Sequence, residues 1–175
     1  MTSVVSKPPL RKAAFLDRDG VINVDSGYVG RWEDFRFVPG VFELLTRLIA
    51  DGYLLVVITN QSGIARGFFT EDDYKRLTEQ YLDVLAHKGI KIDAVYYCPH
   101  HPQGTVVEYS VPCDCRKPAP GMILRAIKEL GIDPSNSLLI GDSERDLEAG
   151  RAAGVGQLIP FQENRPVIWT HTDSQ

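Results

Sequence analysis

Residues 13–20 read Ala13-Ala14-Phe15-Leu16-Asp17-Arg18-Asp19-Gly20, a short apolar run that ends in a pair of acids. An unbroken apolar run of this length is typical of a strand that is buried on both faces of a sheet. The run Leu54-Leu55-Val56-Val57-Ile58 repeats the pattern and ends in Thr59-Asn60-Gln61-Ser62-Gly63. Both runs therefore predict central strands of a parallel sheet, each with polar residues at its carboxyl end.

Segments with helical spacing of apolar residues alternate with these runs. The predicted helices cover residues 41–50, 70–89, 120–130 and 146–153, and the further strands cover 94–97, 138–140 and 157–159. Short connections between alternating strands and helices are typical of an α/β fold. The sequence therefore predicts a Rossmann-like, mainly parallel sheet with helices on both faces.

Length and composition fit one globular domain over residues 1–175, with loosely held ends at about 1–11 and 161–175. The chain has 175 residues, of which 43% are hydrophobic and 24% charged, so its composition is not that of a disordered protein. The formal net charge is −4, and the sequence has no run rich in lysine or arginine. General binding to nucleic acid is therefore not expected.

The start of the chain lacks the apolar segment of a signal peptide, and no apolar run approaches the length of a membrane span. Neither end carries a lipidation motif. These features predict a cytoplasmic protein with no membrane partner. The small size and short connections also predict a monomer.

Acidic side chains follow two of the predicted strands. Asp17 and Asp19 come directly after the first strand, and Asp142 comes after Leu138-Leu139-Ile140-Gly141. Since the carboxyl ends of parallel strands share one edge of the sheet, these acids are expected to converge there. Clustered carboxylates repel each other unless a cation lies between them, and Mg²⁺ prefers oxygen ligands. One carboxylate of such a cluster can attack phosphorus, while another transfers protons.

A basic group to neutralise phosphate is supplied by Arg116-Lys117-Pro118, which directly precedes a predicted helix. Proline restricts the preceding residue to extended conformations, so the side chain of Lys117 can be held in one direction. Taken alone, this pair is also compatible with an ordinary solvated surface. Its interpretation as a phosphate contact depends on the acids described above.

The order of these motifs resembles that of the haloacid-dehalogenase-like (HAD-like) phosphatases. The four matching motifs are Asp17-Arg18-Asp19-Gly20, Thr59-Asn60-Gln61, Lys117-Pro118 and Gly141-Asp142. The stretches Arg116-Lys117-Pro118-Ala119-Pro120-Gly121-Met122 and Thr59–Gly67 are similar to those of sugar-bisphosphate phosphatases, with histidinol-phosphate phosphatases as the alternative. The resemblance covers about residues 13–155.

The resemblance implies a role for each matching residue. Asp17 would be the nucleophile that becomes phosphorylated, and Asp19 would be the general acid and base. Thr59 and Lys117 would hold the phosphoryl oxygens, and Arg116 would help to recognise the substrate. Mg²⁺ would be bound by Asp17, the backbone carbonyl of Asp19 and Asp142.

Two further segments match the substrate contacts of this family, namely Asp25-Ser26-Gly27-Tyr28 and Thr59-Asn60-Gln61-Ser62. The implied substrate is a small sugar phosphate. Asp146 is a candidate for orienting the groups around the metal. The sequence departs from the family at Ser143, where lysine is common, so a substrate contact at that position is not implied. Only about 20 residues separate Asp19 from Pro39, too few for a large cap domain.

The three cysteines of the chain lie in one loop, over residues 98–115. Cys98, His100, Cys113 and Cys115 offer three sulfur ligands and one nitrogen ligand, the set found at structural Zn²⁺ sites. The spacing is tighter than in common zinc fingers, but it matches the zinc loop of the same phosphatases. His101 is the adjacent alternative ligand, and buried free thiols are the simplest alternative. Such a zinc site would fix the loop that leads into Arg116 and Lys117.

Other classes of protein are less compatible with the sequence. The chain has no phosphate-binding loop of the nucleotide-hydrolase type, which disfavours a kinase. Its first strand ends in Asp-x-Asp and not in Gly-x-Gly, which disfavours a dinucleotide-dependent dehydrogenase. A non-catalytic, zinc-stabilised binding module stays open as an alternative, although a binding module needs neither a nucleophile nor a proton-transfer group.

Overall fold

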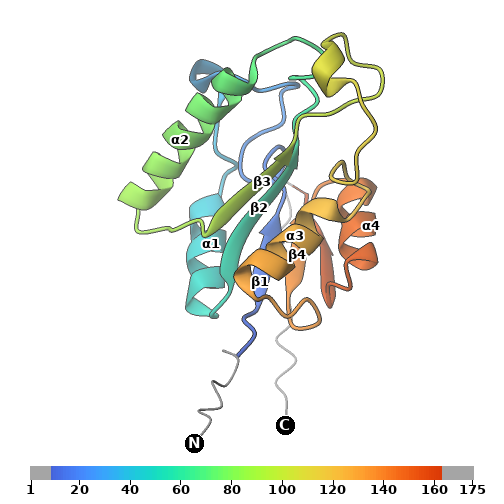
Figure 1. Ribbon diagram of the computed structural model, residues 1–175. Helices are drawn as coiled ribbons and strands as arrows, with labels where there is room; N and C mark the ends of the chain where they lie inside the picture. Colours follow the sequence, from blue (N-terminus) through green and yellow to red (C-terminus); the bar gives the residue numbers. More distant parts are fainter. Residues whose placement is uncertain (1–8, 163–175) are drawn as a thin grey trace, which may run out of the picture.

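One parallel sheet, with strands in the order β3-β2-β1-β4-β5, organises the described residues (Figure 1). The computed structural model describes residues 9–162. The strands are β1 (Ala13–Leu16), β2 (Leu54–Asn60), β3 (Ala94–Cys98), β4 (Leu138–Gly141) and β5 (Gln157–Pro160). The helices are α1 (Val41–Ala50), α2 (Glu71–His87), α3 (Gly121–Leu130) and α4 (Glu144–Ala152), with 3-10 turns at Trp32–Asp34 and Val107–Tyr109. The predicted α/β fold is therefore confirmed.

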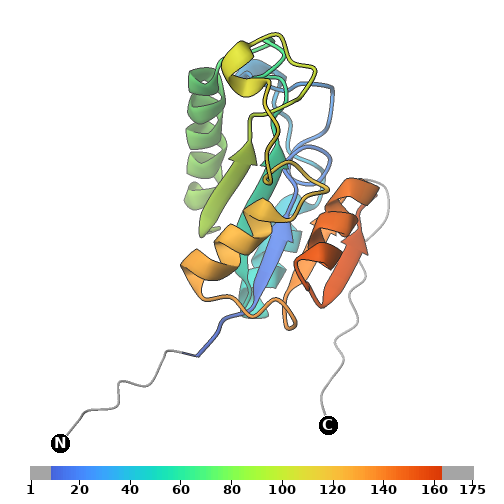
Figure 2. The ribbon, with the colours of Figure 1, turned by 45° about the vertical axis from the view of Figure 1, so that its right-hand side comes forward.

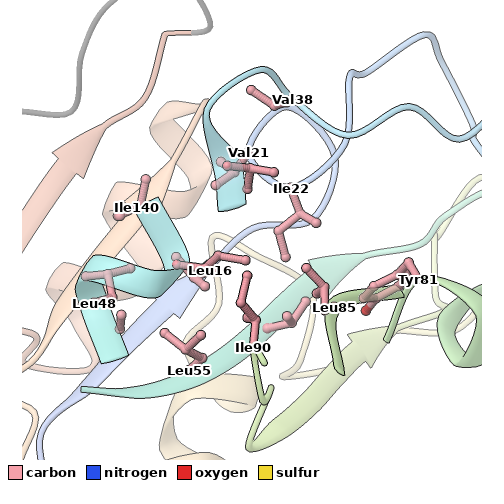
Figure 3. Packing of buried hydrophobic residues seen from close by; sticks show 14 of the residues in the cluster. Leu16, Val21, Ile22, Val38, Leu48, Leu55, Tyr81, Leu85, Ile90 and Ile140 are labelled. Carbon is pink, nitrogen blue, oxygen red and sulfur yellow. The ribbon is translucent and has the colours of Figure 1, made fainter. Parts of the chain in front are cut away.

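The two faces of the sheet are covered by different pairs of helices (Figure 2). Alternate residues of β1 point to opposite faces, so Leu16 packs with α1 and α2 while Phe15 packs with α3 and α4. Figure 3 shows Leu16 between Leu48 of α1 and Leu85 of α2. Because β1 is buried on both sides, the residues that follow it are held on a rigid support.

The ends of the helices agree with the sequence in one case and differ in another. Thr70 begins α2, where its Oγ1 accepts a hydrogen bond from the Asp73 amide (3.1 Å), as its residue type predicts. The last helix begins at Glu144, two residues before the predicted start. The reason is that Asp146 is not the first residue of α4 but accepts hydrogen bonds from the amide and hydroxyl of Ser143, which precedes the helix.

The ends of the described chain are tied to the rest of the domain. The Arg11 amide donates to the Gly131 carbonyl (2.9 Å), and Phe161 is buried with its amide bonded to the Gly141 carbonyl (2.7 Å). Both residues lie within the segments that the sequence predicts to be loosely held; the rest of those segments, residues 1–8 and 163–175, lies outside the described residues. Within residues 9–162, no helix combines the length and the apolar character that a membrane span requires.

The chain connection places a site at the carboxyl edge of the sheet. From β1 the chain proceeds to β2 and β3 on one side, and then returns to β4 and β5 on the other side. The strand order therefore reverses next to β1, and α/β sheets bind ligands at such a point. The segment between β1 and α1 is a loop with one 3-10 turn, so it forms no large cap over this edge.

Candidate active site

Three carboxylates from two strand ends and one helix meet at this edge. Asp17 follows β1, Asp142 follows β4 and Asp146 lies in the first turn of α4. Each offers one oxygen, and the three oxygens lie within 4.8 Å of one another. Gly20 makes this close approach possible, since a Cβ atom at Gly20 would lie 2.0 Å from Oδ2 of Asp142. The structure therefore brings together the side chains of Asp17 and Asp142, as the resemblance implies, and places next to them Asp146, the predicted candidate for orienting the groups around the metal.

Lys117 is buried between two of these acids, with 3% of its side chain exposed. Its Nζ lies 3.0 Å from Oδ1 of Asp17 and 2.6 Å from Oδ1 of Asp146, and it donates to the Ile58 carbonyl at 2.9 Å. Two hydrogen bonds with the Asn60 side chain, of 3.0 and 3.1 Å, hold the backbone of Lys117. The ammonium group is thus fixed next to Asp17, and Asp146 acts on it as a second anchor.

The carboxylates repel each other in the absence of another cation. Burial raises the pKa of Asp17 to about 7, against the lowering effect of Lys117 and with added repulsion from Asp146 and Asp19. Burial also raises the pKa of Asp142 to about 6, with added repulsion from Asp146 and Asp25. Carboxylate oxygens are ligands that a divalent ion prefers, and the charge of the ion offsets the repulsion that makes these carboxyl groups hard to ionise. The site therefore fits Mg²⁺, held by Asp17 and Asp142.

Magnesium is expected to raise the melting temperature more at about pH 8 than at about pH 5. When folding raises the pKa of a carboxyl group, the folded protein loses stability as the pH rises from the pKa of the unfolded state to that of the folded state. For these carboxyl groups that range runs from about pH 4 to about pH 7. Bound Mg²⁺ removes that repulsion at high pH, whereas protons compete with it at low pH. Thermal melts with and without MgCl₂ at both pH values check this, with Asp142→Asn as the control. An equal shift at both pH values contradicts it.

Asp19 is held by three donors next to the cluster. Its Oδ1 accepts hydrogen bonds from Nη2 of Arg18 (2.8 Å) and Nδ2 of Asn23 (3.0 Å). Its Oδ2 accepts from Nε2 of Gln61 (2.9 Å). The carboxyl group is partly exposed, with 22% of the side chain accessible, and it lines the same cavity as Asp17. Its carboxyl group is therefore held at the wall of the cavity that Asp17 also lines.

Thr59 differs from its implied role. Its side chain is fully buried, and its Oγ1 accepts a hydrogen bond from Nε2 of Gln61 (2.8 Å). Thr59 does not line the cavity, whereas Gln61 does. In this structure Thr59 therefore supports Gln61 from behind and makes no direct contact with the space available to a phosphate.

A cavity of about 410 Å³ opens above the acids. Of the predicted substrate contacts, the residues that line it are Asp25, Gly27, Tyr28, Asn60, Gln61, Ser62, Arg116 and Lys117. Ser26 does not line it. The Gly27 amide donates to Oδ1 of Asp25 (3.0 Å), and this tight turn directs the ring of Tyr28 toward Phe68, at 4.6 Å between centroids. The mouth of the cavity is therefore partly aromatic.

Part of the cavity lining is basic. Arg66, His101, Arg116 and Arg145 form this part together. Nη2 of Arg66 lies 3.1 Å from Nε2 of His101, and burial, with repulsion from Arg116, Arg66 and Arg145, lowers the pKa of His101. Sequence reasoning missed Arg66 and Arg145, and it considered His101 only as an alternative zinc ligand. Arg66 and His101 lie in loops without a periodic pattern, and Arg145 lies in the first turn of α4, three residues after Asp142.

The four predicted zinc ligands also converge. Their ligand atoms lie within 4.8 Å of one another, and the measured separations are 3.6 Å for Cys98–Cys113, 3.6 Å for Cys98–His100 and 3.4 Å for His100–Cys115. A tetrahedron with Zn–S bonds of about 2.3 Å has sulfur atoms about 3.8 Å apart, so the cluster has the size of a metal site. His100 supplies Nδ1, while His101 faces the cavity.

The cysteine cluster is coupled to the basic residues through the backbone. Cys115 directly precedes Arg116, whose Nη1 donates to the His100 carbonyl at 3.4 Å. The Gly121 amide at the start of α3 donates to the Asp114 carbonyl at 2.9 Å, and a side chain on Gly121 would collide with that carbonyl. The segment that contains Asp114 and Cys115 is therefore packed directly on α3, and it connects the cysteine cluster to Arg116 at the cavity.

Comparison with known proteins gives consistent results. Residues 114–159 match the HAD-hydrolase-like family. The chain is 50% identical to D-glycero-beta-D-manno-heptose-1,7-bisphosphate 7-phosphatase of Pasteurella multocida over 90% of this chain and 85% of that protein. It is 49% identical to the protein of the same name from Escherichia coli K12 over 89% of this chain and 81% of that protein.

Two solved structures support the same assignment. A HAD-like phosphatase from Mesorhizobium loti is 36% identical and superposes with a TM-score of 0.81 over 89% of this chain and 77% of that chain. A D,D-heptose 1,7-bisphosphate phosphatase from B. bronchiseptica, solved with magnesium and phosphate, is 35% identical with a TM-score of 0.74 over 83% of this chain and 78% of that chain.

Proposed function

The chain belongs to the HAD-like D-glycero-beta-D-manno-heptose-1,7-bisphosphate 7-phosphatases, and from this premise we propose how its own residues remove the C7 phosphate of the β-anomer. The observation that carries the proposal is one cavity that is lined both by Asp17, Asp19 and Lys117 and by several cationic side chains that lie close to one another. The resemblance assigns the product to nucleotide-activated heptose synthesis for lipopolysaccharide core or surface glycans. A single domain would carry the whole reaction.

These two groups of lining residues suit a substrate with two phosphates. We propose that the reacting phosphate is held next to Asp17 and Lys117. The other phosphate would be held by the basic residues, among them Arg116 and Arg145. Guanidinium groups match the geometry of phosphate oxygens, so the basic residues favour a bisphosphate over a substrate with a single phosphate.

In the first step, an oxygen of Asp17 attacks phosphorus, and the bond from phosphorus to the C7 oxygen breaks. Asp19 gives its proton to the leaving oxygen, so the sugar departs as an alcohol. Lys117, fixed 3.0 Å from Asp17, neutralises charge on the phosphoryl oxygens as the bond breaks. This step leaves Asp17 phosphorylated and Asp19 ionised.

In the second step, Asp19 takes a proton from a water molecule, whose oxygen attacks the same phosphorus atom. The bond between phosphorus and Asp17 breaks, which releases inorganic phosphate and restores both carboxyl groups. Asp17, the Asp19 carbonyl and Asp142 would hold Mg²⁺, which would supply positive charge to offset that of the phosphoryl group. Asp146 holds Lys117 in place throughout, through the contact of 2.6 Å.

The test of this function is phosphate release with Mg²⁺ from four substrates. These are the β- and α-anomers of D-glycero-D-manno-heptose 1,7-bisphosphate, the heptose 7-phosphate and histidinol phosphate. The expected result is the highest kcat/KM for the β-bisphosphate. A higher value for histidinol phosphate would overturn the assignment, and ligand binding without phosphate release would favour a binding module.

Arg116→Met is expected to raise KM for the bisphosphate with a smaller effect on heptose 7-phosphate. Loss of one charged contact to phosphate costs about 1.5–3 kcal/mol, which corresponds to about 10- to 100-fold in kcat/KM. Steady-state kinetics on both substrates measure the difference, with Arg125→Met, an exposed arginine of α3, as the matched control. An equal loss of kcat/KM on both substrates would show that Arg116 does not bind the second phosphate.

We also propose that the cluster of Cys98, His100, Cys113 and Cys115 binds structural Zn²⁺. The support is its three sulfur atoms and one imidazole nitrogen at the separations of a tetrahedral site. Four protein ligands leave no position for a substrate or water, so this metal would fix the loop and take no part in the chemistry.

Replacement of Cys113 and Cys115 together by serine is expected to remove the zinc and reduce turnover. Metal binding at such sites is worth on the order of 10 kcal/mol in small peptides, enough to order the loop that carries Arg116 and Lys117. Metal analysis and kcat/KM are measured on the same preparation, with Ser110→Ala in the same loop as the control. Zinc loss with full turnover would refute the proposed role of the loop.

A further inference from the structure

Arg18 is the most deeply buried charged group of the described chain that the mechanism above does not use. Its side chain has no exposed surface, although it directly follows the nucleophile Asp17. Its Nη2 donates to Oδ1 of Asp19 (2.8 Å) and to the Val29 carbonyl (2.7 Å). Its Nε and Nη1 are buried without a hydrogen-bond partner. A guanidinium held under such conditions calls for an explanation.

The remaining surroundings of Arg18 are uncharged. Tyr74 and Tyr81 face it from α2, with Cζ of Arg18 6.0 Å from the Tyr74 ring centroid. Their hydroxyl groups are buried and lack a hydrogen bond of normal geometry. Burial raises the pKa of Tyr74 to about 12, so this hydroxyl stays neutral. Among the described residues, the anionic partner of Arg18 is therefore Asp19.

The two oxygens of Asp19 are held unequally. Oδ1 accepts from both Arg18 and Asn23, and both donors are buried. Oδ2 accepts from Gln61, whose side chain lines the cavity. A charged donor together with a second donor anchors Oδ1 strongly. The carboxyl group is therefore fixed by one oxygen, and its other oxygen is directed to the side from which substrate arrives.

We propose that Arg18, assisted by Asn23, is a positioning residue that anchors Oδ1 of Asp19 and reserves Oδ2 for proton transfer. This inference rests on the proposed function, since it assigns an atom to the general acid and base named there. In the first step the Oδ2–H bond breaks and its proton passes to the C7 oxygen as that oxygen leaves phosphorus. In the second step Oδ2 takes a proton from the attacking water, so the proton balance closes.

The same arrangement indicates a role for Gln61. Its Nε2 is shared between Oδ2 of Asp19 and Oγ1 of Thr59. When the leaving oxygen of the substrate reaches Oδ2, this amide contact is the one that gives way. The two hydrogen bonds to Oδ1 lie behind the carboxyl group and persist, so the orientation of the Asp19 carboxyl group is kept through both steps.

The test compares substrates that differ in their need for a proton. A sugar alkoxide leaves poorly without protonation, whereas p-nitrophenolate leaves readily, so the first turnover of p-nitrophenyl phosphate does not depend on a general acid. Arg18→Met is expected to lower kcat for the heptose bisphosphate about 10²-fold or more, with KM little changed. The first-turnover release of p-nitrophenolate is expected to stay within about threefold of the unaltered protein.

Three further variants complete the comparison. Asp19→Asn removes the proton-transfer group and is expected to show the same dependence on the leaving group. Tyr81→Phe removes a buried hydroxyl that faces Arg18 and leaves Asp19 untouched, so its kinetics should match the unaltered protein. Arg18→Lys, which keeps the charge but offers a single point donor, is expected to recover part of the activity on the bisphosphate.

The outcomes distinguish a failure of the proposed function from a failure of the role inferred for Arg18. If Asp19→Asn lacks the dependence on the leaving group, the proposed function fails. If Asp19→Asn shows it but a folded Arg18→Met protein keeps kcat within about threefold, or loses both substrates equally, Arg18 has a merely structural role and this inference is overturned. Should neither Arg18 variant fold, Asn23→Ser must show the same selective loss, and full activity of that variant overturns the inference.

Discussion

Asp17→Asn is expected to abolish phosphate release, with a loss of at least about 10⁴-fold in kcat, the scale seen when a nucleophile is removed. The amide cannot form the phosphorylated intermediate, since its oxygen is a poor nucleophile and carries no charge. It occupies nearly the same volume, so the sheet edge next to β1 should keep its shape. Malachite-green detection of phosphate under saturating Mg²⁺ and heptose bisphosphate measures the effect.

Asp72→Asn, an exposed acid in the first turn of α2, is the control for the loss of one negative charge. It should leave turnover unchanged. A binding module would tolerate Asp17→Asn with little change in affinity for its ligand. Residual turnover within about tenfold of the unaltered protein would assign the nucleophile to another residue.

Lys117→Met is expected to reduce both turnover and stability. Removal of one donor that stabilises charge in the reaction costs about 10²- to 10³-fold in kcat. Loss of the ammonium also leaves Asp146, with 2% of its side chain exposed, without its cationic partner. Breaking a buried pair in this way destabilises a protein by about 3–5 kcal/mol. Kinetics, together with urea unfolding of the metal-free protein at neutral pH, measure the two losses.

Lys117→Arg separates the two roles of this residue. It keeps a positive charge between Asp17 and Asp146, so its unfolding free energy should fall less than that of Lys117→Met. The larger guanidinium cannot occupy the same buried space, in which Nζ also donates to the Ile58 carbonyl. Turnover should therefore fall in both variants. Normal turnover of Lys117→Met would show that this ammonium does not contact the phosphoryl group.

The parts of the site that could be predicted lie at the ends of buried strands. Asp17 and Asp142 follow continuous apolar runs, and such runs fix both the strand and the direction in which the chain leaves it. The Cys and His ligands are predictable for a similar reason, since a short loop with all the cysteines leaves few other partners. The fold follows from the same alternation of apolar runs and helical spacing.

Other parts of the site depend on contacts between separate segments, which no local sequence pattern predicts. Arg66, His101 and Arg145 come from three separate segments and meet only because the loops after β2 and β3 and the start of α4 lie at one edge of the sheet. The burial of Thr59 behind Gln61 depends on side-chain packing within β2. Arg18 lies inside a recognised motif, yet only the structure reveals that its guanidinium turns inward to Asp19.

The most direct test of the whole account is to trap the phosphorylated enzyme. The protein is mixed with Mg²⁺ and heptose bisphosphate, quenched in acid within the first turnovers, digested and analysed by mass spectrometry. The account predicts the mass of one phosphoryl group on the peptide that contains Asp17, removable by hydroxylamine and absent from Asp17→Asn. A phosphoryl group on a different residue, or rapid phosphate release with no phosphorylated peptide at any time, would contradict it.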